Sequence, residues 1–168
     1  MGNRFEKFKN IKLESDKEPS IAMPKENDRW TYLFAVEELE MRISARDNKE
    51  FVRCTSRVLE SDCPQDPAGE SRTVMIFSDK FGYAELVARL IKAINGGVVE
   101  AAAYENFLAD NTSGSNDDPK KGAGALFRMI VEGKAAQGTG NIYRSMIFEA
   151  VNEDLYTQYQ DVVSTLVS

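Results

Sequence analysis

Hydrophobic and polar residues alternate along residues 30–43, a period typical of β-strands. Every second residue is hydrophobic over residues 30–36, and the alternation resumes in the opposite phase over residues 39–43. The shift falls at Glu37 and Glu38. Because a one-residue slip turns a strand's hydrophobic side chains to the other face, we expect a bulge or sharp bend at one of these two residues. The pattern therefore predicts one long strand, bent in its middle.

The same alternation predicts a second strand over residues 50–59, after a polar turn at residues 45–49. Val52, Cys54 and Val58 share one face of this strand, and Phe51, Arg53, Thr55 and Arg57 share the other. Residues 61–71 contain two prolines, a glycine and several acids, which predicts a loop. A third strand is expected over residues 72–77.

The period then changes. In FGYAELVARLIKAINGG the hydrophobic residues recur at helical spacing, and the paired glycines Gly96 and Gly97 end the predicted helix. A second helix is expected over residues 98–109, followed by a flexible loop of low complexity over residues 111–124. Two strands follow at residues 125–132 and 141–151, and the glycine-rich turn GKAAQGTG joins them.

Three strands, a helical segment and two further strands, with the first strand bent, match the order of elements in an OB-fold. We therefore expect a mainly β protein with helices, built as a five-stranded OB-fold-like barrel with a helical insertion between strands three and four. A general α+β sandwich is the competing architecture. The domain is expected to span residues 29–151, between an extended N-terminal arm at residues 1–28 and a C-terminal tail at residues 152–168 that forms a short helix.

The amino-acid composition excludes several classes of function. The chain of 168 residues contains no histidine, which removes a Ser-His-Asp or Cys-His catalytic site and the commonest transition-metal ligand. Cys54 and Cys63 form no CxxC pair. We expect Cys54 to be a small core residue and Cys63 to be a loop thiol in a reducing compartment. No hydrophobic run approaches the ~20 residues of a membrane helix. We expect a soluble, cytoplasmic protein without enzyme activity, cofactor or bound metal.

The charge is unevenly distributed. A net charge of -6 argues against binding duplex nucleic acid by bulk charge. Residues 120–144 nevertheless hold five basic residues against the single acid Glu132, whereas the chain from Glu149 onward holds four acids and no basic residue. A local basic face therefore remains compatible with an acidic chain.

The region from Pro24 to Asp154 resembles a family of small phage-encoded proteins that are mostly uncharacterised and regarded as single-stranded DNA-binding OB proteins. The matching stretches are EELEMRISARDNKEF, a second strand ending in VLES, GESRTVMIF, a helix closing on AINGG, and FRMIVEGKAAQGTGNIYRSMIFEAV. The resemblance implies the same fold, binding to single-stranded DNA, and a setting in the cytoplasm of a phage host. The loop at residues 116–121 departs from the family, and the tail lacks a strongly acidic tip.

Single-strand binders combine a positive groove that follows phosphates with aromatic rings on which bases stack. One face of the second strand offers this combination, and basic or aromatic residues of neighbouring strands and turns extend it. The predicted nucleic-acid-binding residues are Arg42, Arg46, Phe51, Arg53, Arg57, Arg72, Arg128, Lys134, Tyr143 and Arg144. The alternative is an ordinary solvated face whose arginines pair with Glu38, Glu40 and Glu50. Trp30, Tyr32 and Phe34 are expected in the core.

Two functions follow from these observations. The first is a non-enzymatic single-stranded DNA-binding protein of phage or mobile-element replication or recombination. The second is an assembly protein of a virion or complex, in which the barrel is a scaffold and residues 1–28 and 152–168 bind neighbouring subunits, forming a homo-oligomer or recruiting other partners.

Overall fold

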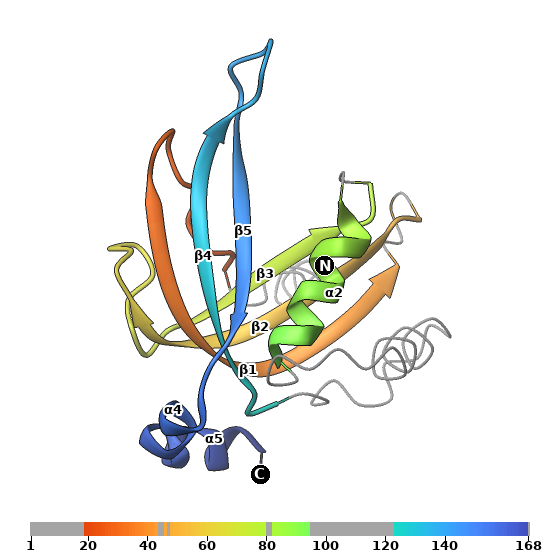
Figure 1. Ribbon diagram of the computed structural model, residues 1–168. Coiled ribbons are helices and arrows are strands. Elements are labelled where there is room, and N and C mark those ends of the chain that lie inside the picture. Colours follow the sequence, from red (N-terminus) through yellow and green to blue (C-terminus); the bar gives the residue numbers. More distant parts are fainter. Residues whose placement is uncertain (1–18, 44–45, 47, 80–81, 95–122, 168) are drawn as a thin grey trace, which may run out of the picture.

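The computed structural model describes residues 19–43, 46, 48–79, 82–94 and 123–167, and only the backbone of Met41, Arg42 and Ile43. Figure 1 shows the arrangement of its elements. In chain order these are β1 (Arg29–Ile43), β2 (Glu50–Ser61), β3 (Ser71–Phe77), α2 (Tyr83–Ile94), β4 (Leu126–Ala135), β5 (Ile142–Ala150), α4 (Glu153–Gln158) and α5 (Gln160–Val167).

The strands form one antiparallel sheet in the order β3-β2-β1-β4-β5. The prediction of a mainly β protein with helices is confirmed. A closed barrel is not confirmed, because β3 and β5 are the two edges of the sheet and no ladder joins them in the described residues. β1 is the central strand: residues 29–35 pair with β4 and residues 32–43 pair with β2, as Figure 1 shows.

A bulge at Glu37 bends β1. Val36 pairs with Ser56 and Glu38 pairs with Thr55, so Glu37 is the extra residue. The bulge predicted from the phase shift is therefore confirmed. It allows Tyr32, Phe34 and Val36 to point into the core before the bend and Leu39 to do so after it.

Aromatic rings fill the core along the first half of β1. The rings of Tyr32 and Phe34 stack with centroids 5.1 Å apart, and Phe34 contacts Phe127 of β4 at 5.4 Å. Phe127 in turn contacts Phe148 of β5 at 6.1 Å. Tyr32 and Phe34 are fully buried and Trp30 is half-buried against the same cluster, which confirms their expected place in the core.

Residues 19–28, called the strap here, lie between the two edge strands. Ser20 forms a parallel bridge with Thr73 of β3, where Ile21 N donates to Thr73 O (3.2 Å) and Thr73 N donates to Pro19 O (2.8 Å). On the other side, Asn27 N donates to Gly133 O (3.0 Å) of β4. The strap thus bonds through its own backbone to the edge strand β3 and to β4, the neighbour of the other edge strand. Residues 1–18 of the predicted arm lie outside the described residues.

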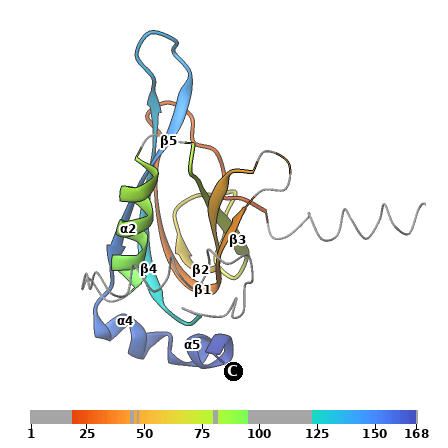
Figure 2. The same cartoon turned by 90° about the vertical axis from the view of Figure 1, so that its right-hand side faces the viewer.

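Helix α2 covers the core beside the open edge. Val87, Leu90, Ile91 and Ala93 are its buried residues, and they share the hydrophobic face that the sequence predicts. The helix lies alongside β5, as Figure 2 shows. The helix predicted before Gly96 is confirmed. The second predicted helix at residues 98–109, and almost all of the loop predicted at residues 111–124, lie outside the described residues.

The tail forms two short helices where one was expected. Asn152 caps α4, because its side chain accepts from Leu155 N at 3.3 Å. The Tyr156 hydroxyl accepts from Leu126 N (2.9 Å) and donates to Leu126 O (3.3 Å), which holds the tail against β4.

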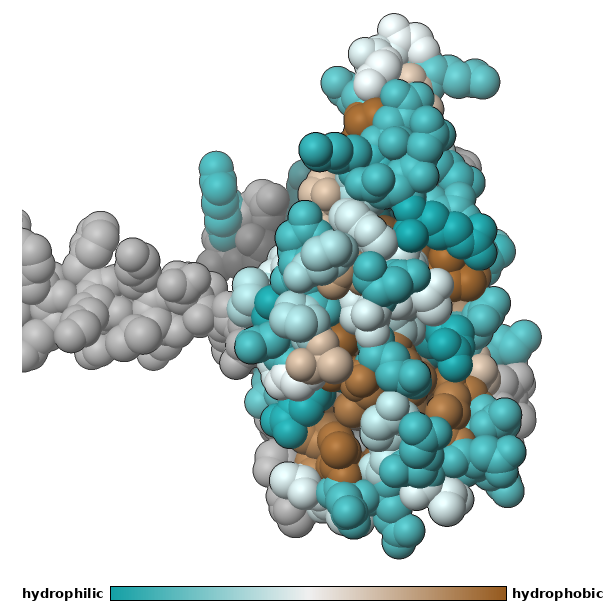
Figure 3. Space-filling view, turned by 90° about the vertical axis from the view of Figure 1, so that its left-hand side faces the viewer, coloured by the Kyte–Doolittle hydropathy of each residue, from teal (hydrophilic) through white to brown (hydrophobic). Residues whose placement is uncertain are grey.

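In Figure 3, hydrophobic residues gather in the lower half of an otherwise largely hydrophilic face. None of the helices in the described part of the chain is long and hydrophobic enough to cross a membrane.

We predict that Gly133→Ala displaces the strap. A Cβ at Gly133 would lie 2.0 Å from Lys25 O, so the strap backbone has to move. Overpacking of this kind costs about 1–3 kcal/mol in the free energy of unfolding. Limited trypsin digestion followed by mass spectrometry should show faster cleavage after Lys25.

The control is Gly138→Ala in the same β4–β5 hairpin. Its φ of +90° strains any side chain, but a Cβ there meets nothing within 4 Å. If both variants are cleaved after Lys25 at the same rate, contact with Gly133 does not hold the strap.

Candidate functional site

A groove opens between β3 and β5, where the sheet does not close. Its volume is about 430 Å³, within the range of ligand sites in proteins. The strap, β3, α2 and β5 all contribute to its walls. The described residues that line it are Met23, Met75, Ile76, Phe77, Leu86, Ile142, Tyr143, Arg144 and Met146.

Hydrophobic surface is concentrated in this groove. Met23, Tyr143 and Phe77 are 54%, 49% and 38% exposed, and they are three of the five large hydrophobic residues most exposed in the described chain. Contiguous exposed hydrophobic surface marks interaction sites more often than isolated residues do. The groove is therefore the best candidate for a binding surface.

Aromatic surface extends from the groove onto β2. The ring of Phe51 lies 5.7 Å from that of Phe77, tilted by 36°. Phe51 and Phe77 are directly opposite each other in the β2–β3 register, and Phe77 lines the groove. Phe51, predicted from the sequence, thus lies at the rim of the groove.

Arg144 is the one charged residue among the described residues that line the groove. Its guanidinium Nη1 donates to Ile21 O of the strap at 3.3 Å. Burial lowers the pKa of Arg144, while electrostatic interactions with Tyr32 and Asp66 act in the opposite direction. An arginine remains protonated under these conditions, so the groove contains a partly desolvated cation.

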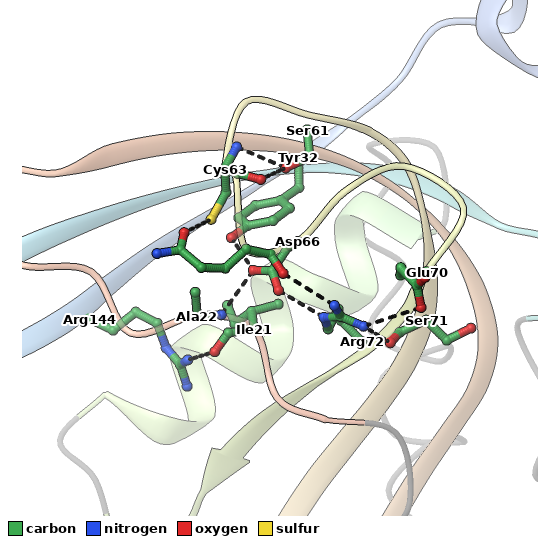
Figure 4. Close-up of polar contacts among 11 residues, drawn as sticks. Ile21, Ala22, Tyr32, Ser61, Cys63, Asp66, Glu70, Ser71, Arg72 and Arg144 are labelled. Carbon is green, nitrogen blue, oxygen red and sulfur yellow. Dashed lines mark hydrogen bonds and ion pairs between the residues drawn. The ribbon is translucent and has the colours of Figure 1, made fainter.

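The carboxylate of Asp66 organises the interior beside the groove, as Figure 4 shows. It is 2% exposed and accepts from Ala22 N of the strap (2.9 Å), the Tyr32 hydroxyl (2.7 Å) and Arg72 Nε (2.8 Å). Burial alone would raise the pKa of Asp66, but these three donors together lower it below its usual value. Asp66 is therefore a charged anchor for the strap, β1 and β3.

Tyr32 is held as a hydrogen-bond donor in this cluster. Burial raises the pKa of its hydroxyl, and bonds to Cys63 and Asp66 raise it further. The hydroxyl therefore stays protonated at neutral pH and continues to donate to Asp66.

Three of the predicted binding arginines are paired with carboxylates. Arg53 bonds to Glu40 through Nε (3.1 Å) and Nη2, and its side chain is only 13% exposed. Arg57 Nε lies 3.3 Å from Glu37. Arg72 bonds to Asp66 from the interior side of β3 and also donates to Ser71 O and Gln65 O. Since their charges are matched within the chain, we place none of these three arginines in the candidate site.

The remaining predicted residues are divided between the groove and other places. Lys134 is exposed, pairs in register with Tyr143, and lies 4.0 Å from Glu132. Arg128 is half-buried on the face of β4 away from the core and lies opposite Glu149 in register. Arg46 is exposed in the β1–β2 turn, and the side chain of Arg42 lies outside the described residues. Of the predicted residues whose side chains are described, Tyr143 and Arg144 line the groove, Phe51 contacts Phe77 at its rim and Lys134 lies beside Tyr143. Arg46, Arg53, Arg57, Arg72 and Arg128 do not line it.

Sequence reasoning missed the groove residues Met23, Met75, Phe77 and Met146. Met75 and Phe77 alternate with Val74 and Ile76, so both faces of β3 are hydrophobic near its end. Because both faces of such an edge strand must be covered by other residues, this pattern was the signal in the sequence that could have indicated a binding surface at β3. For Met23 there was none, because the position of the strap depends on contacts with distant residues.

The described residues include no group of three or more His, Cys, Asp or Glu arranged to hold a metal ion. Cys54 and Cys63 are buried free thiols. Burial raises the pKa of the Cys54 thiol to about 11, and the hydrogen bond to Ser56 lowers it by a smaller amount. The thiol is therefore protonated and unreactive at neutral pH.

Neither the protein-family models nor the curated proteins compared with this chain give a match.

We predict that Asp66→Asn destabilises the fold at neutral pH. The substitution leaves Arg72, 14% exposed, without its buried carboxylate, and loss of one partner of such a pair costs about 3–5 kcal/mol. Urea unfolding followed by circular dichroism measures the change. The control is Asp62→Asn, whose exposed carboxylate accepts from Thr31 N and should cost about 1 kcal/mol or less. Equal losses in both variants would contradict the anchoring role.

We also predict a specific loss of stability in acid. The folded pKa of Asp66 is lowered, so its contribution is complete above the unfolded value of about 3.9. It is lost as pH falls from there through the lower folded pKa. Urea unfolding between about pH 5 and pH 2 should therefore show a steeper decline for the natural protein than for Asp66→Asn. Parallel curves would rule out this source of acid sensitivity.

Proposed function

We propose that this protein is a non-enzymatic single-stranded DNA-binding protein with an OB-fold-like architecture. The observation that carries the proposal is the groove between β3 and β5, where the rings of Phe77 and Tyr143 and the cation of Arg144 meet.

The element order and sheet order support the OB-like assignment. A bent first strand at the centre of the sheet, the order β3-β2-β1-β4-β5, and a helix between β3 and β4 are the layout of that fold. In this chain the strap lies where β3 and β5 would otherwise meet, bonding to Thr73 on one side and to Arg144 on the other. We interpret the molecule as an OB-like sheet closed by its own N-terminal segment.

The groove lies near the ends of two strand pairs whose connecting loops flank the nucleic-acid site in an OB-fold. Phe77 pairs with Phe51, which follows the β1–β2 turn, and Ile142 follows the β4–β5 turn. The loops between these strand pairs carry ligand contacts in OB-folds. A strand crossing the groove would pass from one turn to the other.

Stacking supplies the main energy in this proposal. Each base that stacks on an aromatic side chain contributes about 1–3 kcal/mol, and stacking tolerates any sequence. Phe77, Tyr143 and the neighbouring Phe51 offer such surfaces at the groove and its rim. Arg144 within the groove supplies positive charge in a chain whose net charge is -6.

The assembly function gains less from the structure. It relies on the arm and the tail to bind neighbouring subunits, but the described parts of both contact their own sheet. The strap bonds to β3 and β4, and Tyr156 of the tail bonds to Leu126. The resemblance to phage-encoded proteins adds a setting to our proposal, namely phage or mobile-element DNA replication or recombination in a host cytoplasm.

We predict that the double variant Phe77→Ala/Tyr143→Ala loses most of the affinity for a single-stranded oligonucleotide. Loss of two stacking surfaces should cost about 1–3 kcal/mol for each ring. Fluorescence anisotropy with a labelled thymidine oligonucleotide at low salt measures the change, and affinity should fall as salt rises.

Ile147→Ala is the matched control, because Ile147 is 40% exposed on β5 but does not line the groove. Unchanged circular dichroism spectra must accompany all variants. The function is refuted if the natural protein shows no affinity at low salt, and the groove is excluded as its site if the double variant and the control bind equally well.

A further inference from the structure

Within the groove, polar recognition depends on a single side chain. Of the N–H groups that the Arg144 guanidinium carries, the described contacts use one, which donates to Ile21 O. The neighbouring carboxylate of Asp66 is already occupied by Ala22, Tyr32 and Arg72. The remaining donors of Arg144 are therefore available to a ligand.

The surroundings of these donors favour a flat, largely uncharged group. Met75 lies on the β3 side of the groove and Met146 on the β5 side, and thioether side chains adapt to aromatic rings. A phosphate placed among such residues would lose its hydration without a second cation to compensate. A nucleobase would instead present its faces to the hydrophobic walls and its edge to Arg144.

The donor pattern of Arg144 distinguishes between the bases. A guanidinium is planar and offers parallel N–H donors, so it suits an edge with two adjacent acceptors. Guanine presents O6 and N7 side by side. Adenine places an amino donor beside N7, and thymine places a methyl group beside O4 on the corresponding edge. Unpaired cytosine also presents two adjacent acceptors, O2 and N3, but its single ring offers less surface than guanine to the hydrophobic walls of the groove.

We propose that Arg144 is a specificity-determining residue that selects guanine for the groove between β3 and β5. The inference rests on the proposed function and adds a base preference to it. The hydrogen bond to Ile21 O fixes the guanidinium against the strap, so the strap positions the group that reads the base.

The test compares four labelled oligonucleotides that differ from an all-thymidine strand at one central position. They carry guanine, adenine, cytosine or 7-deazaguanine, which lacks the N7 acceptor, and affinity for the cytosine strand equal to that for the guanine strand overturns the inference. Anisotropy should show that guanine raises the affinity of the natural protein by at least about fivefold over thymine, the lower limit for a bidentate pair. Adenine and 7-deazaguanine should lose most of this gain.

Two variants test whether Arg144 is responsible. Arg144→Met retains a long side chain without donors, and Arg144→Lys retains the charge without the planar pair of donors. Both variants should bind the guanine and the all-thymidine oligonucleotides with about equal affinity. In Arg144→Met the slope of log affinity against log salt should change by less than the ~0.7 that one phosphate contact on a single strand contributes. Circular dichroism and thermal unfolding establish that each variant is folded.

The possible outcomes are distinct. A guanine preference that 7-deazaguanine and both variants abolish supports the inference. Binding without base preference overturns it and leaves the proposed function intact. The inference is also overturned if the preference for guanine persists in Arg144→Lys, or if the salt slope of Arg144→Met falls by a full phosphate contact. Either result would mean that Arg144 contacts the phosphate backbone of the DNA and does not read the base. If the natural protein binds none of the oligonucleotides, the proposed function itself fails.

Discussion

The buried carboxylate of Asp66 is the interaction on which the rest of the structure depends. A charge with 2% exposure is tolerable only when donors surround it, and its donors come from the strap, from β1 and from β3. Asp66 therefore links the loop before β3 to the strap and to β1, whose bonded residues lie 44 and 34 positions earlier in the chain. The strap held at this place bonds to β3 and to Arg144 of β5, and its Met23 lines the groove between these two strands.

This arrangement separates the arginines into structural and available groups. Arg53, Arg57 and Arg72 each face a carboxylate of the chain, so their positive charge is neutralised within the fold. Arg144 bonds to a backbone carbonyl instead, and retains its charge in hydrophobic surroundings. An acidic chain of net charge -6 can thus contain a local cationic group, because the described residues that line the groove include Arg144 and no carboxylate.

The fold was largely predictable, whereas the site was only partly so. The hydrophobic pattern and the turn signals predicted the five strands. The phase shift placed a bulge or bend at Glu37 or Glu38, because side chains alternate with a period of two along one strand. Phe51, Tyr143 and Arg144 were predicted and lie at the groove. Met23 and Phe77 were missed, since their role depends on which segments lie beside them, and the pairing of Arg53 with Glu40 had been recognised only as an alternative.

The sequence by itself determined the local elements: the bent first strand, the amphipathic helix α2, the turns, and the order of strands and helices along the chain. Only the tertiary structure decided that residues 19–28 lie between β3 and β5, and that Arg144 reaches Ile21, 123 positions away in the chain. The physical reason is one of range. Backbone conformation responds to neighbouring residues, whereas the partner of a buried charge depends on which distant segments the complete fold brings together.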